Sequence, residues 1–109
     1  MNRKIEYTFP QGALRDDKLL GPYQAWDYGP LVVVKMGDPA NLRTTHYSIT
    51  AKSSGLALLG HVNKQRVARL WAAVAAALPM DWNNPPATFD ALPAIAQKLF
   101  RGWERAQYD

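Results

Sequence analysis

The chain has 109 residues, of which 48% are hydrophobic and 20% charged, a balance typical of a globular protein rather than a disordered one. It has no cysteine, which excludes disulfide bonds and thiolate chemistry and leaves His46 and His61 as the imidazole groups available to a metal. We therefore expect a single domain over residues 1–109 with no metal and no cofactor. The net charge of +4 favours acidic partners, either protein surfaces or nucleic acids.

Membrane insertion and export are not expected from this sequence. No window approaches the roughly 18 apolar residues that a membrane helix needs. The first nine residues, MNRKIEYTF, lack the apolar core of a signal peptide. We expect a cytoplasmic protein that does not enter a membrane.

The first third of the chain predicts three short β-strands. Residues 3–9 alternate strictly between apolar and polar side chains, which is typical of a half-buried strand. Two β-prone runs follow within residues 23–36, and a Gly-Pro pair separates them. The continuous branched run Leu31–Val34 favours a central strand covered on both faces.

Residues 44–62 predict a β-hairpin. Its two strands, residues 44–51 and 56–62, are joined by a four-residue link that ends in Gly55. Alternation places one set of side chains of the first strand toward the core, namely Tyr47, Ile49 and Ala51. The other set is expected to face outward, namely His46, Ser48 and Thr50.

The longest helix-periodic segment runs from Asn63 to Leu78. Its large apolar side chains recur at helical spacing and predict one buried stripe: Val67, Leu70, Trp71, Val74 and Leu78. We expect Asn63 to cap the first turn and Pro79 to end the helix. The alanines on the rest of the helix indicate either plain helix stability or a smooth face for another helix or a partner.

A second helical pattern lies near the C-terminus, with Asp90 expected as its N-cap and Pro93 in its first turn. Its apolar stripe is expected to pack on the sheet or on the first helix: Leu92, Ile95, Ala96, Leu99, Phe100 and Trp103. Strands followed by helices indicate an α+β fold. We expect an antiparallel β-meander of four or five strands followed by two C-terminal α-helices packed on one face of the sheet.

Basic side chains form the first candidate binding surface. Lys64, Arg66 and Arg69 crowd the start of the first helix, where the helix dipole disfavours a cation by about 0.3–1 kcal/mol. Both an anion site and an ordinary solvated helix face are consistent with this placement. Arg101 and Arg105 leave the outer side of the second helix positive as well.

Aromatic side chains form a weaker candidate surface. Tyr23, Trp26 and Tyr28 cluster just before the central strand. Such residues usually fill a sheet core, although beside basic residues they also form stacking platforms for single-stranded nucleic acid. The basic residues are not interleaved with these aromatics, which counts against a platform.

Catalytic motifs are missing from the sequence. It has no Gly-x-Ser-x-Gly elbow and no His-x-x-x-His pair. His46 or His61 could serve as a general base only if Asp27 or Asp38 converged with it in space. We therefore do not expect an enzyme.

Two functions remain open. The favoured one is a small non-enzymatic binding or regulatory protein, such as a phage or mobile-element accessory, that docks on and inhibits a host protein through basic helix and sheet surfaces. The alternative is direct nucleic-acid binding through Lys64, Arg66 and Arg69, assisted by Arg43 or Lys52. Monomer and homodimer are both open, since the alanine face or the edge of the first strand could join two copies.

Overall fold

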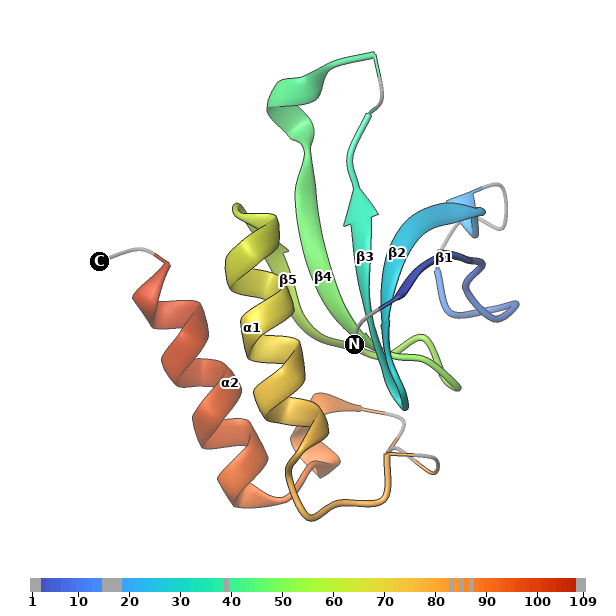
Figure 1. Ribbon diagram of the computed structural model, residues 1–109. Helices are drawn as coiled ribbons and strands as arrows, with labels where there is room; N and C mark the ends of the chain where they lie inside the picture. The colour runs from blue at the N-terminus through green and yellow to red at the C-terminus, as the bar shows by residue number, and fades with distance from the viewer. Residues whose placement is uncertain are drawn as a thin grey trace.

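The computed structural model describes residues 3–14, 19–38, 40–82, 84, 86 and 88–107. Five antiparallel strands form a sheet in the order β1-β2-β3-β4-β5, and two helices pack on one of its faces (Figure 1). The strands are β1 (Arg3–Tyr7), β2 (Tyr23–Tyr28), β3 (Leu31–Met36), β4 (His46–Ala51) and β5 (Ala57–Val62). The helices are α1 (Gln65–Ala76) and α2 (Ala94–Ala106). The expected α+β meander is confirmed.

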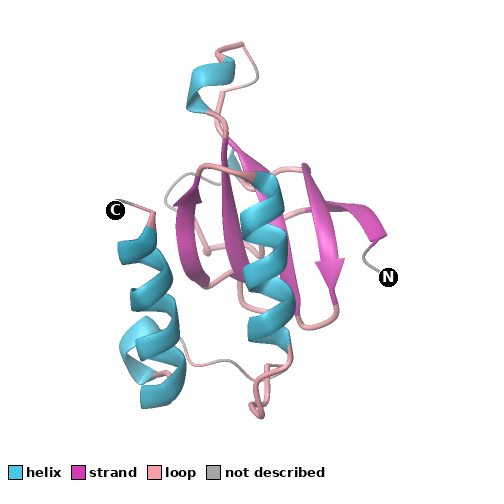
Figure 2. Ribbon diagram, turned by 60° about the vertical axis from the view of Figure 1, so that its left-hand side comes forward, coloured by secondary structure: helices cyan, strands magenta, loops and turns pink. Residues whose placement is uncertain are grey.

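The two helices lie side by side and antiparallel, with α1 across the sheet and α2 beyond it on the β5 side (Figure 2). None of the helices in the described residues has the length and apolar character needed to cross a membrane.

The central strand β3 is buried on both faces, as predicted. All four residues of Leu31–Val34 are inaccessible to solvent. Val33 pairs with Trp26 and Ile49, and these three side chains belong to the core beneath the helices. Val32 points to the opposite face, into a smaller second core.

The second core is built by the segment that follows β1. Phe9 donates its amide to the carbonyl of Leu20 at 2.8 Å, and the Tyr7 hydroxyl donates to the Lys52 carbonyl at 2.8 Å. Both aromatic rings are buried on the sheet face away from the helices, and burial raises the pKa of Tyr7.

The second core explains one wrong prediction. Ser48 and Thr50 were expected to face outward, but they are 4% and 0% exposed, and their hydroxyls hydrogen-bond to each other at 2.9 Å. Alternation along β4 identifies the two faces of the strand correctly. It cannot reveal that the second core, which holds Val32 and Val34, also covers the outer face of β4 where Thr50 and Ser48 pair with them.

The predicted buried stripe of α1 is only partly confirmed, because Val67, Trp71 and Leu78 are half-buried and pack against the core but Leu70 and Val74 are exposed. The residues that are fully buried are Ala68, Ala72 and Ala75, while Leu70 is 63% and Val74 is 44% exposed. Small side chains allow the helix backbone to approach the sheet closely. The alanine face is therefore the inner face of α1, while Trp71 also contacts α2 and Leu70 and Val74 lie toward solvent.

Both expected helix caps were also wrong. The N-cap of α1 is Lys64 rather than Asn63, and its side chain makes no capping hydrogen bond. The N-cap of α2 is Pro93, because Asp90 lies in a preceding 3-10 turn, Phe89–Ala91. In α2 and the residues before it, Leu92, Ala96 and Phe100 are buried as predicted, whereas Ile95 is 65% exposed.

Candidate interaction surfaces

The outer surface of the helix pair carries exposed apolar side chains. Leu70 and Val74 lie one turn apart on α1, and Ile95 and the half-buried Leu99 lie one turn apart on α2. Because the helices run antiparallel, the C-terminal half of α1 is beside the N-terminal half of α2. We call the surface formed by these four residues the outer helix face. It is an apolar strip that the described part of the chain leaves uncovered.

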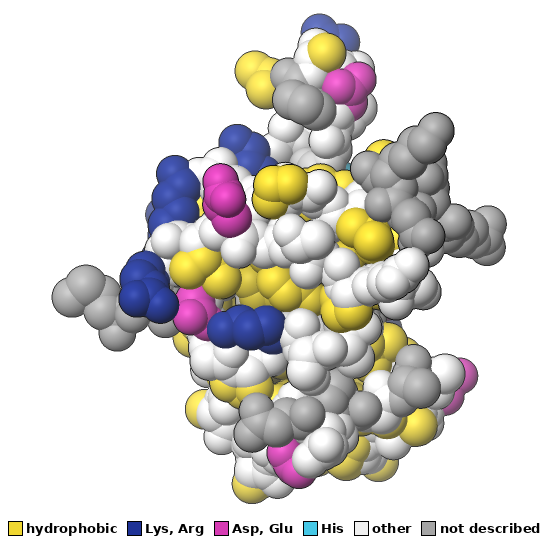
Figure 3. Space-filling view, turned by 90° about the vertical axis from the view of Figure 1, so that its right-hand side faces the viewer, with side chains coloured by type: hydrophobic (Ala, Val, Ile, Leu, Met, Phe, Trp, Pro, Cys, Tyr) yellow, Lys and Arg dark blue, Asp and Glu magenta, His cyan; other side chains and the backbone are white. Residues whose placement is uncertain are grey.

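The helices also account for the net charge of the chain. They contain five cations and one glutamate, namely Arg66, Arg69, Lys98, Arg101, Arg105 and Glu104, a balance of +4. The whole chain has the same net charge of +4, so all other residues together are neutral. The side of the molecule that carries β1 shows the contrast, since Lys and Arg lie there beside Asp and Glu (Figure 3).

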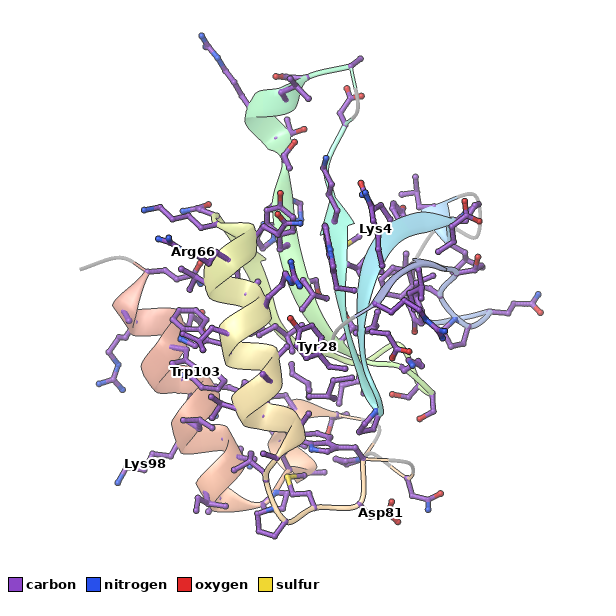
Figure 4. All side chains as sticks on the ribbon, viewed as in Figure 1. Lys4, Tyr28, Arg66, Asp81, Lys98 and Trp103 are labelled. Carbon is purple, nitrogen blue, oxygen red and sulfur yellow. The ribbon has the colours of Figure 1, made fainter. Side chains whose placement is uncertain are left out.

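The five basic residues predicted as one patch do not form one. Arg66 projects from the first turn of α1, while Lys98, which the sequence analysis did not select, projects from the outer side of α2 (Figure 4). Arg101 and Arg105 line a hollow along α2 together with Lys98. Arg101 is also held locally, because it lies 3.6 Å from the Asp90 carboxylate and 5.6 Å from the centre of the Phe89 ring.

The other two predicted basic residues face different directions. Lys64 lines a hollow of about 310 Å³ between the start of α1 and the end of α2, next to Val67 and Trp71. Arg69 is half-buried and turns toward β2. The cationic character of the helix layer is thus spread over its surface and not concentrated at the α1 N-terminus.

The predicted aromatic surface is divided between the two sides of the sheet. Trp26 and Tyr28 are buried beneath α1, with 6% and 8% exposure, whereas Tyr23 lies on the opposite face with its ring 5.8 Å from that of Phe9. A base cannot stack on rings that are already covered. The structure therefore does not bring these three residues onto one exposed platform.

The Arg69 side chain lies over the Trp26 ring. Its guanidinium carbon lies 5.7 Å from the centre of the Trp26 ring, a distance at which cation–π attraction acts. Its Nε–H donates to the Tyr28 hydroxyl at 3.1 Å. No local pattern predicts this contact, because Arg69 is separated from Tyr28 by 41 positions.

The histidines and aspartates do not converge on a catalytic centre. His46 and His61 stack on each other, with ring centroids 4.4 Å apart, and His61 has a left-handed φ of 56° in a bulged part of β5. The Asp27 carboxylate is bonded to Lys52, whose hydrogen bond lowers the pKa of Asp27. The Asp38 carboxylate accepts from the amide of Ala40. Within the described residues, no group of three potential metal ligands occurs.

A further exposed feature lies at the end of the β3–β4 hairpin, which projects beyond the sheet in Figure 1. Its short 3-10 turn, Leu42–Thr44, places Leu42 at 77% exposure beside Arg43. The run of turn residues before it predicts the loop, but not that a leucine stands at its tip.

Comparisons with protein-family models, with curated proteins and with solved structures found no match.

Proposed function

We propose that this chain is a non-enzymatic binding protein that docks on an acidic surface of a protein partner through its outer helix face. The observation that carries the proposal is that α1 buries alanines and leaves two of its larger apolar side chains exposed. Three alanines of α1 are buried against the sheet, while Leu70 and Val74 on α1 and Ile95 on α2 stay accessible. An apolar strip of this kind with polar surroundings is typical of a protein contact.

Charge indicates the kind of partner. The apolar strip lies within a helix layer of net charge +4, with Arg66 at one end and Lys98 beside Ile95 and Leu99 on α2. A second copy would bring the same cations against each other, which like-charge repulsion disfavours. A different protein with an apolar ridge between acidic side chains complements both properties.

Nucleic acid fits this surface less well. A phosphate backbone needs clustered cations, but Arg69 is turned toward β2 and Arg101 is engaged by Asp90. The four residues that define the outer helix face are aliphatic and offer no ring for base stacking. We therefore place a protein first, and docking on an acidic functional surface would inhibit or regulate that protein, as expected of a small phage or mobile-element accessory.

The test is site-specific photocrosslinking in cells of the native host. A photoreactive residue at position 95 should capture one protein partner, and the same residue at the exposed position 57 on β5 should not. Leu70→Gln together with Lys98→Glu should abolish the capture, while Lys4→Glu on β1 should leave it intact. Capture at both positions alike, capture that survives the helix variants, or crosslinking to nucleic acid would refute the proposal.

A further inference from the structure

A groove runs along the side of α1 that faces β2, away from the outer helix face. It has a volume of about 620 Å³ and is lined on the helix side by Ala73, Ala76 and Ala77. Tyr28, Gly29 and Arg3 line the sheet side. The alanines make a smooth apolar wall, because none of their side chains extends beyond Cβ.

Arg69 does not line this groove itself, but it contacts one of the lining residues, Tyr28. It precedes Ala73 by one helical turn on the same side of α1, and its Nε–H donates to the hydroxyl of Tyr28, a lining residue, at 3.1 Å. From Arg69 to Ala76 the helix rises by about 10 Å. A cation therefore lies beside Tyr28, close to the apolar wall formed by the alanines.

The guanidinium of Arg69 is fixed, but none of the described residues supplies a counter-ion to it. Tyr28 holds its Nε and the Trp26 ring lies 5.7 Å from its central carbon, so its orientation is set. In the part of the chain that the structure describes, no carboxylate lies within ion-pair distance of it. A half-buried, oriented guanidinium presents a planar fork that matches the two oxygens of a carboxylate.

The charged groups that line the groove do not form an ion pair with Arg69 among the described residues. Asp27 also lines the groove, but it is paired with Lys52 and accepts from the Gly29 amide at 3.0 Å. Arg3 adds a second cation to the lining. The groove therefore keeps an excess of positive charge that a ligand would neutralise.

We infer that this groove binds a carboxylate on a short apolar stem, with the carboxylate at Arg69 and the stem along the alanine wall. A small aliphatic acid and the free end of a peptide both present this chemistry. The site is separate from the outer helix face, since Arg69 and Ala73 are on the β2 side of α1 while Leu70 and Val74 are not. The groove and the outer helix face can therefore be tested independently, and failure of one does not affect the other.

The experiment is a titration with hexanoate at pH 7, followed through the indole N–H resonance of Trp26, which lies beneath Arg69. We expect saturable binding with a Kd on the order of 1 mM, as for a small ligand in an open groove. Acetate should bind about tenfold more weakly because it lacks the methylenes that the wall would bury. Hexanol should not bind, because it cannot pair with the guanidinium.

Variants separate the two parts of the site. Arg69→Gln should abolish hexanoate binding, Arg69→Lys should weaken it severalfold because the fork is lost, and Ala73→Leu should block it by filling the groove. Arg105→Gln, which removes a helix cation elsewhere, should have no effect. If Arg69→Gln fails to fold, loss of hexanoate binding in Ala73→Leu still tests the site.

The outcomes that overturn the inference are equally distinct. Equal affinity for acetate and hexanoate, or binding unaffected by Ala73→Leu, would leave a bare anion site and remove the apolar stem. No saturable shift at Trp26 would remove the site altogether. An alanine pentapeptide that binds with a free but not with an amidated C-terminus would identify a chain end as the ligand, and binding of hexanoate alone a small acid.

Discussion

The indole rings of Trp71 and Trp103 stack nearly parallel, with centroids 5.2 Å apart and planes inclined by 7°. Trp71 is on α1 and Trp103 on α2, so this contact joins the two helices. Phe100 packs against Trp103, with ring centroids 5.5 Å apart and nearly perpendicular ring planes. Among the strands, the second helix lies closest to β5, and this aromatic group adds a direct contact with α1.

We expect Trp103→Ala to lower the free energy of unfolding by about 2–3 kcal/mol, less than for a fully buried tryptophan because both rings are half-exposed. Urea unfolding of Trp71→Ala, Trp103→Ala and the double variant would measure the coupling between the rings. Offset stacking of aromatic rings predicts a coupling of about 0.5–1.5 kcal/mol. Strict additivity of the two substitutions would show that the rings do not stabilise each other.

The inner face of α1 should tolerate no added volume. Ala72 is fully buried against the sheet, and Ala73, the next residue, is exposed. Ala72→Leu should therefore lower the free energy of unfolding by about 1–3 kcal/mol through overpacking. Ala73→Leu should change it by less than about 0.5 kcal/mol. Circular dichroism during urea unfolding would compare the two, and equal effects would mean that α1 is rotated relative to the structure.

The sequence could not predict which face of α1 is buried. Leu70 and Val74 follow helical spacing as clearly as any core stripe, so the helix itself was predictable and its orientation was not. Which face of a helix is buried depends on how near its backbone lies to the sheet. The inner face of the sheet already carries Trp26, Leu31 and Ile49, and the α1 residues that are fully buried against this core are alanines.

The strands were predicted more reliably because alternation is a local property. The run Leu31–Val34 identified the central strand, and Gly55 ended the hairpin link where it was expected. Contacts between distant residues had no such signal. The stacking of Arg69 on Trp26, the pairing of Asp27 with Lys52 and the stack of His46 on His61 all depend on how separate elements pack.

The ion pair between Asp27 and Lys52 should give the fold a measurable acid sensitivity. The hydrogen bond from Lys52 lowers the pKa of Asp27, so the folded state binds this proton less readily than the unfolded state. The stabilisation is therefore complete above the unfolded pKa, near 3.8, and is lost as the pH falls through the lower folded pKa. Because the Lys52 side chain is 35% exposed, we expect at most about 1 kcal/mol at neutral pH.

Unfolding measured between pH 7 and pH 2 would test this pair. Asp27→Asn should lower the stability at pH 7, and its stability should fall less steeply than that of the unmodified protein below about pH 4. Glu6→Gln on the neighbouring strand β1 is the matched control, since Glu6 is exposed and has no ion pair among the described residues. An unchanged acid slope in Asp27→Asn would contradict the expected pKa difference.

Two glycines should respond in opposite directions to alanine. Gly37 has a φ of +111°, and a Cβ there would lie 2.5 Å from the Thr44 carbonyl oxygen. Gly37→Ala should lower the free energy of unfolding by about 2 kcal/mol or more. Gly102 is within α2 with open space around it, so Gly102→Ala should raise it by about 0.5–1 kcal/mol. Thermal unfolding would resolve both shifts, and a stabilising Gly37→Ala would contradict the described turn.

The outer helix face should be dispensable for folding, because a side chain that solvent already reaches loses little by becoming polar. Leu70 and Ile95 are 63% and 65% exposed, whereas Leu92 is 4% exposed. Leu70→Gln and Ile95→Gln should each change the free energy of unfolding by less than about 0.5 kcal/mol. Leu92→Gln should lower it by about 2–4 kcal/mol, because it loses buried apolar contacts and places an amide in the core. If Leu70→Gln destabilised the protein as much as Leu92→Gln does, Leu70 would belong to the core, and the docking surface proposed for the helices would lose its basis.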